Sequence, residues 1–173
     1  MGETISQGDL ILLRREWKRN GQRVVFASGC FDLLHPGHIR LLEQARSLGD
    51  ILVVGLQSDR SIRAASGPRT GPGGESMTSA PSHPVTPAAE RSEILAALAA
   101  VDYVAEFDEP SPSALLASLV PDIVVRGGAA GSERVAFCED NEVEAAGGKV
   151  VRVPLEPGYS TTGLVERITR HRA

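Results

Sequence analysis

Two histidines three residues apart are the side chains of this sequence best placed to do chemistry. His35 and His38 follow an apolar run, residues 23–27, that is typical of a buried strand, and they open a helical pattern over residues 39–48. In the first turn of a helix they lie beside backbone N–H groups that have no partner within the helix. Those N–H groups, the helix dipole and the open approach at Gly37 predict an anion site. Imidazole N–H donors there suit the phosphates of a nucleotide.

Two other interpretations of the histidine pair stay open. The histidines can be metal ligands, although zinc takes three or four ligands and Cys30 is the only other soft donor nearby. They can also cap the helix without any chemistry. We interpret Cys30 as a small residue that fills the turn, because no sequence feature marks a base that would activate its thiol.

The complete turn resembles the signature of the nucleotidyltransferase superfamily that includes the cytidylyltransferases. That signature is a glycine, a Phe-Asp pair and His-x-Gly-His at the first strand–helix junction, and here it reads Gly29, Phe31-Asp32 and His35-Pro36-Gly37-His38. The resemblance extends from about Leu10 to Ile168. It is closest to the adenylyltransferase domain of bifunctional ADP-heptose synthases, which act on heptose 1-phosphate. The residues that match this branch include Pro84-Val85-Thr86-Pro87, Glu90-Arg91, Arg126-Gly127-Gly128 and Ser160-Thr161-Thr162.

Composition limits the class of protein. The 173 residues suffice for one domain with a hydrophobic core. A net charge of −4 and an aromatic content of 4% disfavour nucleic-acid binding, so we expect no nucleic-acid partner. No apolar run has membrane-spanning length, and the two cysteines, Cys30 and Cys138, do not form a disulfide framework. We therefore expect a cytoplasmic protein that does not bind membranes.

Five short apolar runs alternate with helical patterns, which predicts a single α/β domain with a doubly wound five-stranded parallel sheet. The runs are residues 23–27, 51–56, 103–106, 122–126 and 149–153. The resemblance implies a Rossmann-like fold with strand order 3-2-1-4-5. We expect residues 1–21 to form an N-terminal helical extension and residues 22–173 to form the nucleotidyltransferase domain. Within the extension, we expect Arg14, Arg15, Lys18 and Arg19 on the solvent side.

Residues 66–87 form a long Gly/Pro/Ser/Thr-rich stretch that predicts a flexible loop, either a lid over the site or a simple insertion. Thr86 and Pro87 then begin a helix. Its buried stripe is expected to comprise Ile94, Leu95, Leu98 and Val101.

Ligands of such sheets bind at the carboxyl ends of the strands, where the strand order reverses. The chemistry that fits is attack by a substrate phosphate on the α-phosphorus of a nucleoside triphosphate, with release of pyrophosphate. We expect His35 and His38 to donate to phosphate oxygens as negative charge builds on them. Ser160 and Thr161, at the start of the last helix, offer a second helix end for the leaving phosphates. Plain N-capping is the alternative for Ser160.

The nucleotide is expected to contact several further residues. Gly127 and Gly128 would let the base lie against the backbone, although the pair can also be a mere turn. Asp32 would orient substrate or hold Mg²⁺ through water, with a structural cap as its alternative. The resemblance implies Mg²⁺ with the triphosphate and no direct protein ligand for it. The predicted nucleotide-binding set is Gly29, Cys30, Phe31, Asp32, Gly37, Arg126, Gly127, Gly128 and Thr162.

Three departures from the family pattern concern the acceptor. Arg63 stands where relatives usually carry a phosphate-neutralising lysine, and the two side chains are not equivalent donors. His83 stands where the branch typically has arginine, and Ala129-Ala130 replace Asp-Tyr after the glycine pair. We expect Asp32, Arg63 and His83 to bind the phosphorylated substrate, whose identity these departures leave open.

Three functions follow. The first is adenylyl transfer from ATP to a sugar phosphate such as heptose 1-phosphate. The second is cytidylyl transfer from CTP to glycerol 3-phosphate, another phospho-alcohol or a phosphonate. The third is a nucleotide-binding regulatory module without turnover. The resemblance leaves a homodimer open, and because these residues contain no sugar-kinase half, we expect the domain to act alone or beside a separate kinase.

Overall fold

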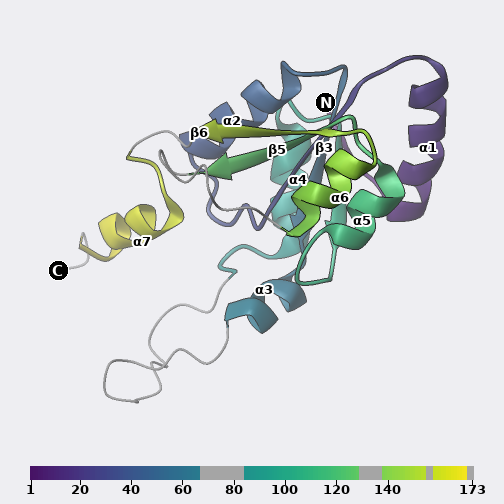
Figure 1. The fold of residues 1–173 in the computed structure, drawn as a ribbon. Coiled ribbons are helices and arrows are strands. Elements are labelled where there is room, and N and C mark those ends of the chain that lie inside the picture. Colours follow the sequence, from purple (N-terminus) through teal and green to yellow (C-terminus); the bar gives the residue numbers. More distant parts are fainter. Residues whose placement is uncertain (67–83, 129–137, 155–157, 171–173) are drawn as a thin grey trace.

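The computed structural model describes residues 1–66, 84–128, 138–154 and 158–170 (Figure 1). The strands are β1 (Glu3–Thr4), β2 (Val24–Gly29), β3 (Ile51–Gln57), β4 (Tyr103–Phe107), β5 (Ile123–Gly128) and β6 (Lys149–Pro154). The helices are α1 (Gln7–Arg19), α2 (Pro36–Arg46), α3 (Asp59–Ser66), α4 (Ala88–Ala97), α5 (Ser113–Leu119), α6 (Cys138–Ala145) and α7 (Thr161–Arg170).

The strands form one parallel sheet in the order β1-β4-β3-β2-β5-β6. The five predicted strands are β2 to β6, and they lie in the predicted order. The predicted number of strands is wrong, because β1 adds a sixth strand that pairs with β4 through Glu3 and Thr4. Two polar residues carry no apolar pattern, so nothing in the sequence signals this edge strand.

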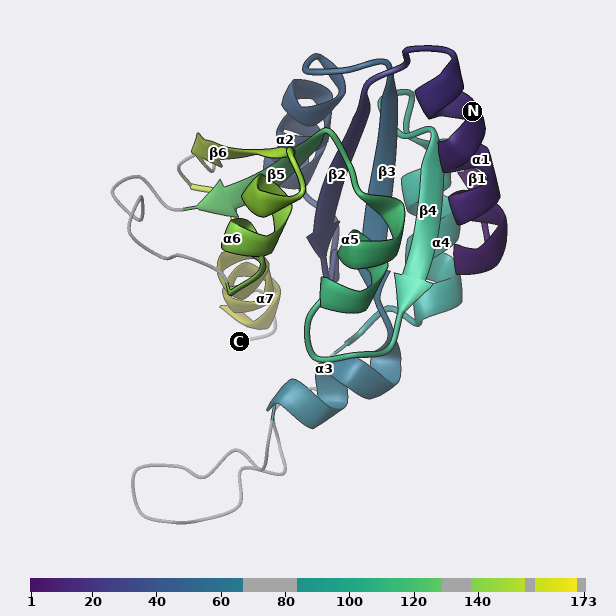
Figure 2. The same ribbon diagram turned by 45° about the vertical axis from the view of Figure 1, so that its right-hand side comes forward.

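Helices cover both faces of the sheet, and β2 lies near its centre (Figure 2). On one face α2 and α4 pack against the strands through side chains such as Leu42 and Leu95; on the other, α1, α5 and α6 pack through Leu10, Leu119 and Val143. Burying each such leucine contributes about 1.5–3 kcal/mol. Strands buried on both faces explain the near-continuous apolar runs of the sequence.

Arg14 does not lie on the solvent side of α1, contrary to the prediction. Its guanidinium is buried and donates to the carbonyls of Leu119 and Val120, and it lies 3.2 Å from the Asp122 carboxylate. Those carbonyls end α5, where the helix offers them no N–H partner. Leu12 of the same helix is exposed. The carbonyls that bind Arg14, as well as apolar contacts, therefore determine which face of α1 turns inward.

The predicted buried stripe of the helix after the loop is also partly wrong. Ile94 of α4 is exposed, whereas Arg91 and Leu95, four residues apart, lie on the buried face. The helix begins one residue later than expected, with Pro87 as the N-cap residue.

No helix in the described parts of the chain is long and apolar enough to cross a membrane.

Gly55 of β3 gives a test of the close packing of the central strands. A Cβ atom at this position would lie 2.5 Å from the Phe26 ring, so the Gly55→Ala substitution must displace a buried aromatic side chain. We expect the free energy of unfolding in urea to fall by about 1–3 kcal/mol. Gly8→Ala is the matched control, because a Cβ atom at Gly8 meets only the Ser6 Oγ atom at 3.8 Å. Equal stability of the two variants would contradict the packing described here.

Candidate active site

The residues of the predicted anion site form the turn between β2 and α2. His35 is the N-cap residue of α2, Pro36 occupies the first turn, and the His35 and His38 rings stack with centroids 3.8 Å apart and planes at 15°. The Phe31 ring meets the His38 ring edge-on at 5.5 Å. We call the turn from Gly29 to His38 the cradle. Both imidazoles therefore lie at one end of α2, as the three-residue spacing predicts.

The orientation of the histidine rings decides which nitrogen a ligand can meet. Both Nδ1 atoms are buried and, among the described residues, have no hydrogen-bond partner. A Cβ atom at Gly37 would lie 3.0 Å from the His35 Nδ1 atom, so only glycine leaves room for this ring. Because a buried unpaired N–H group is rarer than an unpaired acceptor, we assign the proton of each neutral ring to Nε2. The Nε2–H groups are then the donors available to an anion.

Both histidines have lowered pKa values. Burial lowers the pKa of His38 to about 4, and the neighbouring His35 lowers it further. Burial also lowers the pKa of His35; a contact with its own backbone partly offsets this shift, and the positive charge of Arg167 adds to it. At neutral pH both rings are therefore uncharged, which permits their close stacking.

Asp32 connects the cradle to two other segments. Its buried carboxylate accepts hydrogen bonds from the N–H groups of Val85 (2.9 Å) and Thr86 (3.0 Å), and its carbonyl accepts from the Thr161 hydroxyl (3.2 Å). Asp32 therefore caps backbone N–H groups, the structural role that the sequence offered as its alternative. Thr161 brings the start of α7 against the cradle, as expected for a second helix end at this site.

The residues before α7 lie on the same side. The Ser160 Oγ atom accepts from the Gly163 N–H at 3.0 Å, so Ser160 caps the helix. Its neighbour Tyr159, which the sequence did not indicate, places its ring 6.4 Å from the His35 ring, and the Arg40 guanidinium lies 5.5 Å from the Tyr159 centroid. Thr162 lies in α7, but its side chain is outside the described part of the structure.

Arg126 lies in β5, two residues before the strand ends, with its guanidinium turned toward α6. It lies 3.3 Å from the carboxylates of both Glu139 and Asp140, and all three side chains are buried. Gly127 and Gly128 continue β5 in register with β6, at the same edge as the cradle. Ala129 and Ala130 lie outside the described residues.

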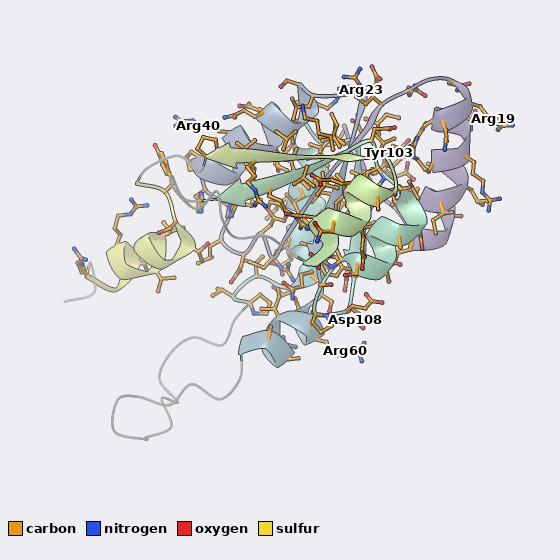
Figure 3. The ribbon with its side chains drawn as sticks, in the orientation of Figure 1. Arg19, Arg23, Arg40, Arg60, Tyr103 and Asp108 are labelled. Carbon is orange, nitrogen blue, oxygen red and sulfur yellow. The ribbon has the colours of Figure 1, made fainter. Side chains whose placement is uncertain are left out.

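Of the three predicted substrate-binding residues, Asp32 lies in the cradle and Arg63 on α3. Arg63 lies on α3, exposed, with its guanidinium 3.8 Å from Asp59. Arg60 on the same helix pairs instead with Asp108, which follows β4 (Figure 3). His83 and the central part of the predicted loop lie outside the described residues.

Within the described ranges, no three His, Cys, Asp or Glu side chains are grouped so that they could hold a metal ion. Mg²⁺ commonly binds through substrate phosphates, waters and one or two carboxylates. Asp32 is the only predicted carboxylate in the cradle, and its oxygens already accept backbone N–H groups.

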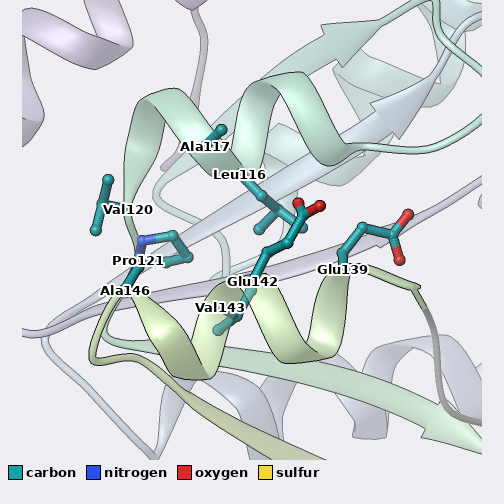
Figure 4. Close-up of a pocket in the computed structure, with 8 residues that line it drawn as sticks. All are labelled: Leu116, Ala117, Val120, Pro121, Glu139, Glu142, Val143 and Ala146. Atoms are coloured by element: carbon teal, nitrogen blue, oxygen red, sulfur yellow. The ribbon is translucent and has the colours of Figure 1, made fainter.

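A separate cavity of about 220 Å³ lies between α5 and α6 and holds none of the predicted site residues (Figure 4). It is lined by Leu116, Ala117, Val120, Pro121, Glu139, Glu142, Val143 and Ala146. We therefore do not place the nucleotide there.

The lowered pKa of His38 makes stability depend on pH in a definite direction. Between pH 6.5, the ordinary value in an unfolded chain, and about 4, the unfolded state binds the proton more readily than the folded state. We expect the free energy of unfolding to fall as pH is lowered through this range. The His38→Asn variant should lose that part of the slope in urea titrations at several pH values. Parallel curves for the two proteins would contradict the assigned burial.

Known proteins resemble this chain in sequence and in fold. Residues 26–71 match the family described as cytidylyltransferase-like. The chain is 43% identical to the bifunctional protein HldE of Koribacter versatilis over 95% of its length, and 46% identical to that of Syntrophotalea carbinolica over 87%. It spans about 31% and 28% of the length of these relatives.

Solved structures support the fold. The lipopolysaccharide core biosynthesis protein from Thermoplasma volcanium aligns with a TM-score of 0.59 and 26% identity, covering 79% of this chain and 99% of that one. Pantoate-beta-alanine ligase from Francisella tularensis, at 14% identity, aligns with a TM-score of 0.61 over 100% of this chain and 78% of that one, and shows a shared fold only. Together, the sequence matches confirm the predicted resemblance to the cytidylyltransferase-like nucleotidyltransferases.

Proposed function

We propose that this chain transfers an adenylyl group from ATP to a sugar 1-phosphate, such as heptose 1-phosphate, and releases pyrophosphate. The observation that carries the proposal is the stacked pair His35 and His38 at the start of α2, with both Nδ1 atoms buried and unpartnered among the described residues. Two imidazoles stacked at a helix N-terminus, with the Nδ1 side of each ring buried, leave the two Nε2–H groups as the donors that we propose an anion meets. An anion with several oxygens, such as a triphosphate, matches this pair of donors.

The reaction needs positioning and charge neutralisation more than covalent help from the protein. An oxygen of the acceptor phosphate attacks the α-phosphorus and forms the new P–O bond. The bond from the α-phosphorus to the oxygen that bridges to the β-phosphate breaks, and pyrophosphate leaves with the electron pair. His35 and His38 donate hydrogen bonds to oxygens on which negative charge increases. Mg²⁺, when bound with the triphosphate, supplies further charge neutralisation.

The choice of ATP and a sugar 1-phosphate rests on the relatives. The HldE proteins of Koribacter versatilis and Syntrophotalea carbinolica align with 95% and 87% of the chain, so the similarity extends well beyond the cradle. Ser160 and Thr161 begin α7, and Thr161 contacts the cradle carbonyl of Asp32. We propose that this second helix end holds the leaving phosphates, while Gly127 and Gly128 lie against the base. Arg63, on the exposed side of α3, is the candidate cation for the acceptor phosphate.

Replacing either histidine tests the mechanism. We expect His35→Ala and His38→Ala each to reduce pyrophosphate release by on the order of a hundredfold or more, because a donor to developing charge contributes several kcal/mol at the transition state. Glu43→Ala, on the exposed side of the same helix, is the control and should keep near-normal turnover. Near-normal rates in both histidine variants would overturn the mechanism.

The substrate assignment needs a matrix of nucleotides and acceptors with Mg²⁺. ATP and CTP would each be combined with heptose 1-phosphate, other sugar 1-phosphates, glycerol 3-phosphate and a simple phosphonate. Turnover with ATP and a sugar 1-phosphate is the expected result. Turnover only with CTP would replace the proposal with a cytidylyltransferase. Nucleotide binding without pyrophosphate release from any pair would favour the regulatory module.

A further inference from the structure

Arg91 is the largest fully buried side chain of the described structure, with 1% of its surface exposed. It lies in the first turn of α4 and its guanidinium faces the carboxyl edge of the sheet. A buried guanidinium must have partners for its N–H groups, because an uncompensated buried charge is strongly destabilising. The partners of Arg91 therefore show which parts of the chain it holds together.

Those partners come from three segments around the cradle. The Nη1 group donates to the carbonyls of Cys30, in the cradle, and Gln57, at the end of β3 (3.0 Å to Gln57). The Nη2 group lies 2.6 Å from the Asp59 carboxylate at the start of α3. The Nε group donates to the carbonyl of Thr86 at 2.9 Å. One side chain thus joins the cradle, the β3–α3 junction and the approach to α4.

The cradle needs such support because its backbone is strained. Phe31 and Leu33 both have φ of 47°, in the left-handed region that side chains other than glycine rarely adopt. Residues in this region persist only where the surrounding structure holds them. Arg91 fixes the carbonyl of Cys30 immediately before Phe31, and the Asp32 carboxylate between the two strained residues holds Val85 and Thr86.

Arg91 also acts on α3. Its partner Asp59 extends the other carboxylate oxygen to within 3.8 Å of the Arg63 guanidinium. A change at Arg91 therefore alters the position of Asp59 and the direction of Arg63 as well as the cradle. Only 1% of the Arg91 surface is exposed to solvent, so Arg91 cannot touch a substrate.

We propose that Arg91 is a positioning residue for the candidate active site. It holds the strained cradle, and with it His35 and His38, in a fixed relation to Asp59 and Arg63. Its effect on turnover rests on the proposed function, whereas its effect on the cradle does not. Arg91 replaced by an apolar side chain would leave the core filled and the cradle without its anchor.

Arg14 provides a matched control. It is also a buried arginine that donates to backbone carbonyls of a distant segment and pairs with one carboxylate. Its partners Leu119, Val120 and Asp122 precede β5, at the opposite edge of the sheet from the cradle (Figure 2). Arg14→Met and Arg91→Met therefore remove similar interactions, but only the second removes them from the site.

The first measurement follows the histidines directly. The chain contains four histidines, so their ring C–H signals in NMR can be assigned with His35→Asn and His38→Asn variants. We expect Arg91→Met to shift the titration of His35 and His38, and Arg14→Met to leave it unchanged, while both lower the thermal unfolding midpoint. Titrations of His35 and His38 that are the same in all three proteins would overturn the proposal.

The second measurement uses ATP affinity and pyrophosphate release well below the lower unfolding midpoint. Misplacement of the donors should weaken ATP binding and reduce kcat/KM by about tenfold to a hundredfold in Arg91→Met, with Arg14→Met within about twofold of wild type. Equal losses in the two variants would overturn the proposal. Arg91→Lys keeps the charge but not the fork of donors, and it should show the same losses if Arg91→Met fails to fold. Failure of the wild-type chain to release pyrophosphate would overturn only the proposed function, because the histidine titration needs no substrate.

Discussion

The turn between β2 and α2 is the constraint on which the candidate site depends. It must place His35 at the N-cap of α2 and turn His38 back to stack on it, and to do so it takes Phe31 and Leu33 through left-handed backbone conformations. Each such residue costs about 1–2 kcal/mol. Interactions from distant segments offset this cost: the Asp32 carboxylate binds the approach to α4, and the Arg91 guanidinium binds the carbonyl of Cys30.

The parallel sheet makes those long-range interactions available. β2 lies between β3 and β5, and all three run in the same direction, so Gly29, Gln57 and Gly128 end at one edge. This is also where the strand order reverses, the position at which open α/β sheets bind ligands. α3 follows β3 and α4 precedes β4, its neighbour in the sheet, so that Arg91 of α4 meets both Asp59 and the Cys30 carbonyl of the cradle. The sheet topology thus places both the candidate ligand-binding edge and the contacts of Asp59 and Arg91 next to the cradle.

Sequence patterns predicted the apolar strands and the cradle, but they did not predict the buried charges. The strands β2 to β6 and the histidine spacing are local features, and the structure shows both. Arg14, Arg91 and Arg126 lie inside because carbonyls and carboxylates far away in the sequence meet them. A pattern that assigns charged residues to solvent cannot anticipate such partners. Arg91 had one local signal, its position one helical turn before buried Leu95.

The lowered pKa values of the histidines bear on whether the pair is structural or binds an anion. Two protonated rings 3.8 Å apart would repel each other, and burial already disfavours the charged form of His38. The pair does not stabilise α2 as a side-chain cap, because His35 makes no side-chain hydrogen bond to the first turn. A phosphate that arrives beside the rings favours their charged form and raises their pKa values. Under the proposed function, negative charge on the phosphates would offset the cost of burying the histidines, and most fully where that charge is largest, in the transition state.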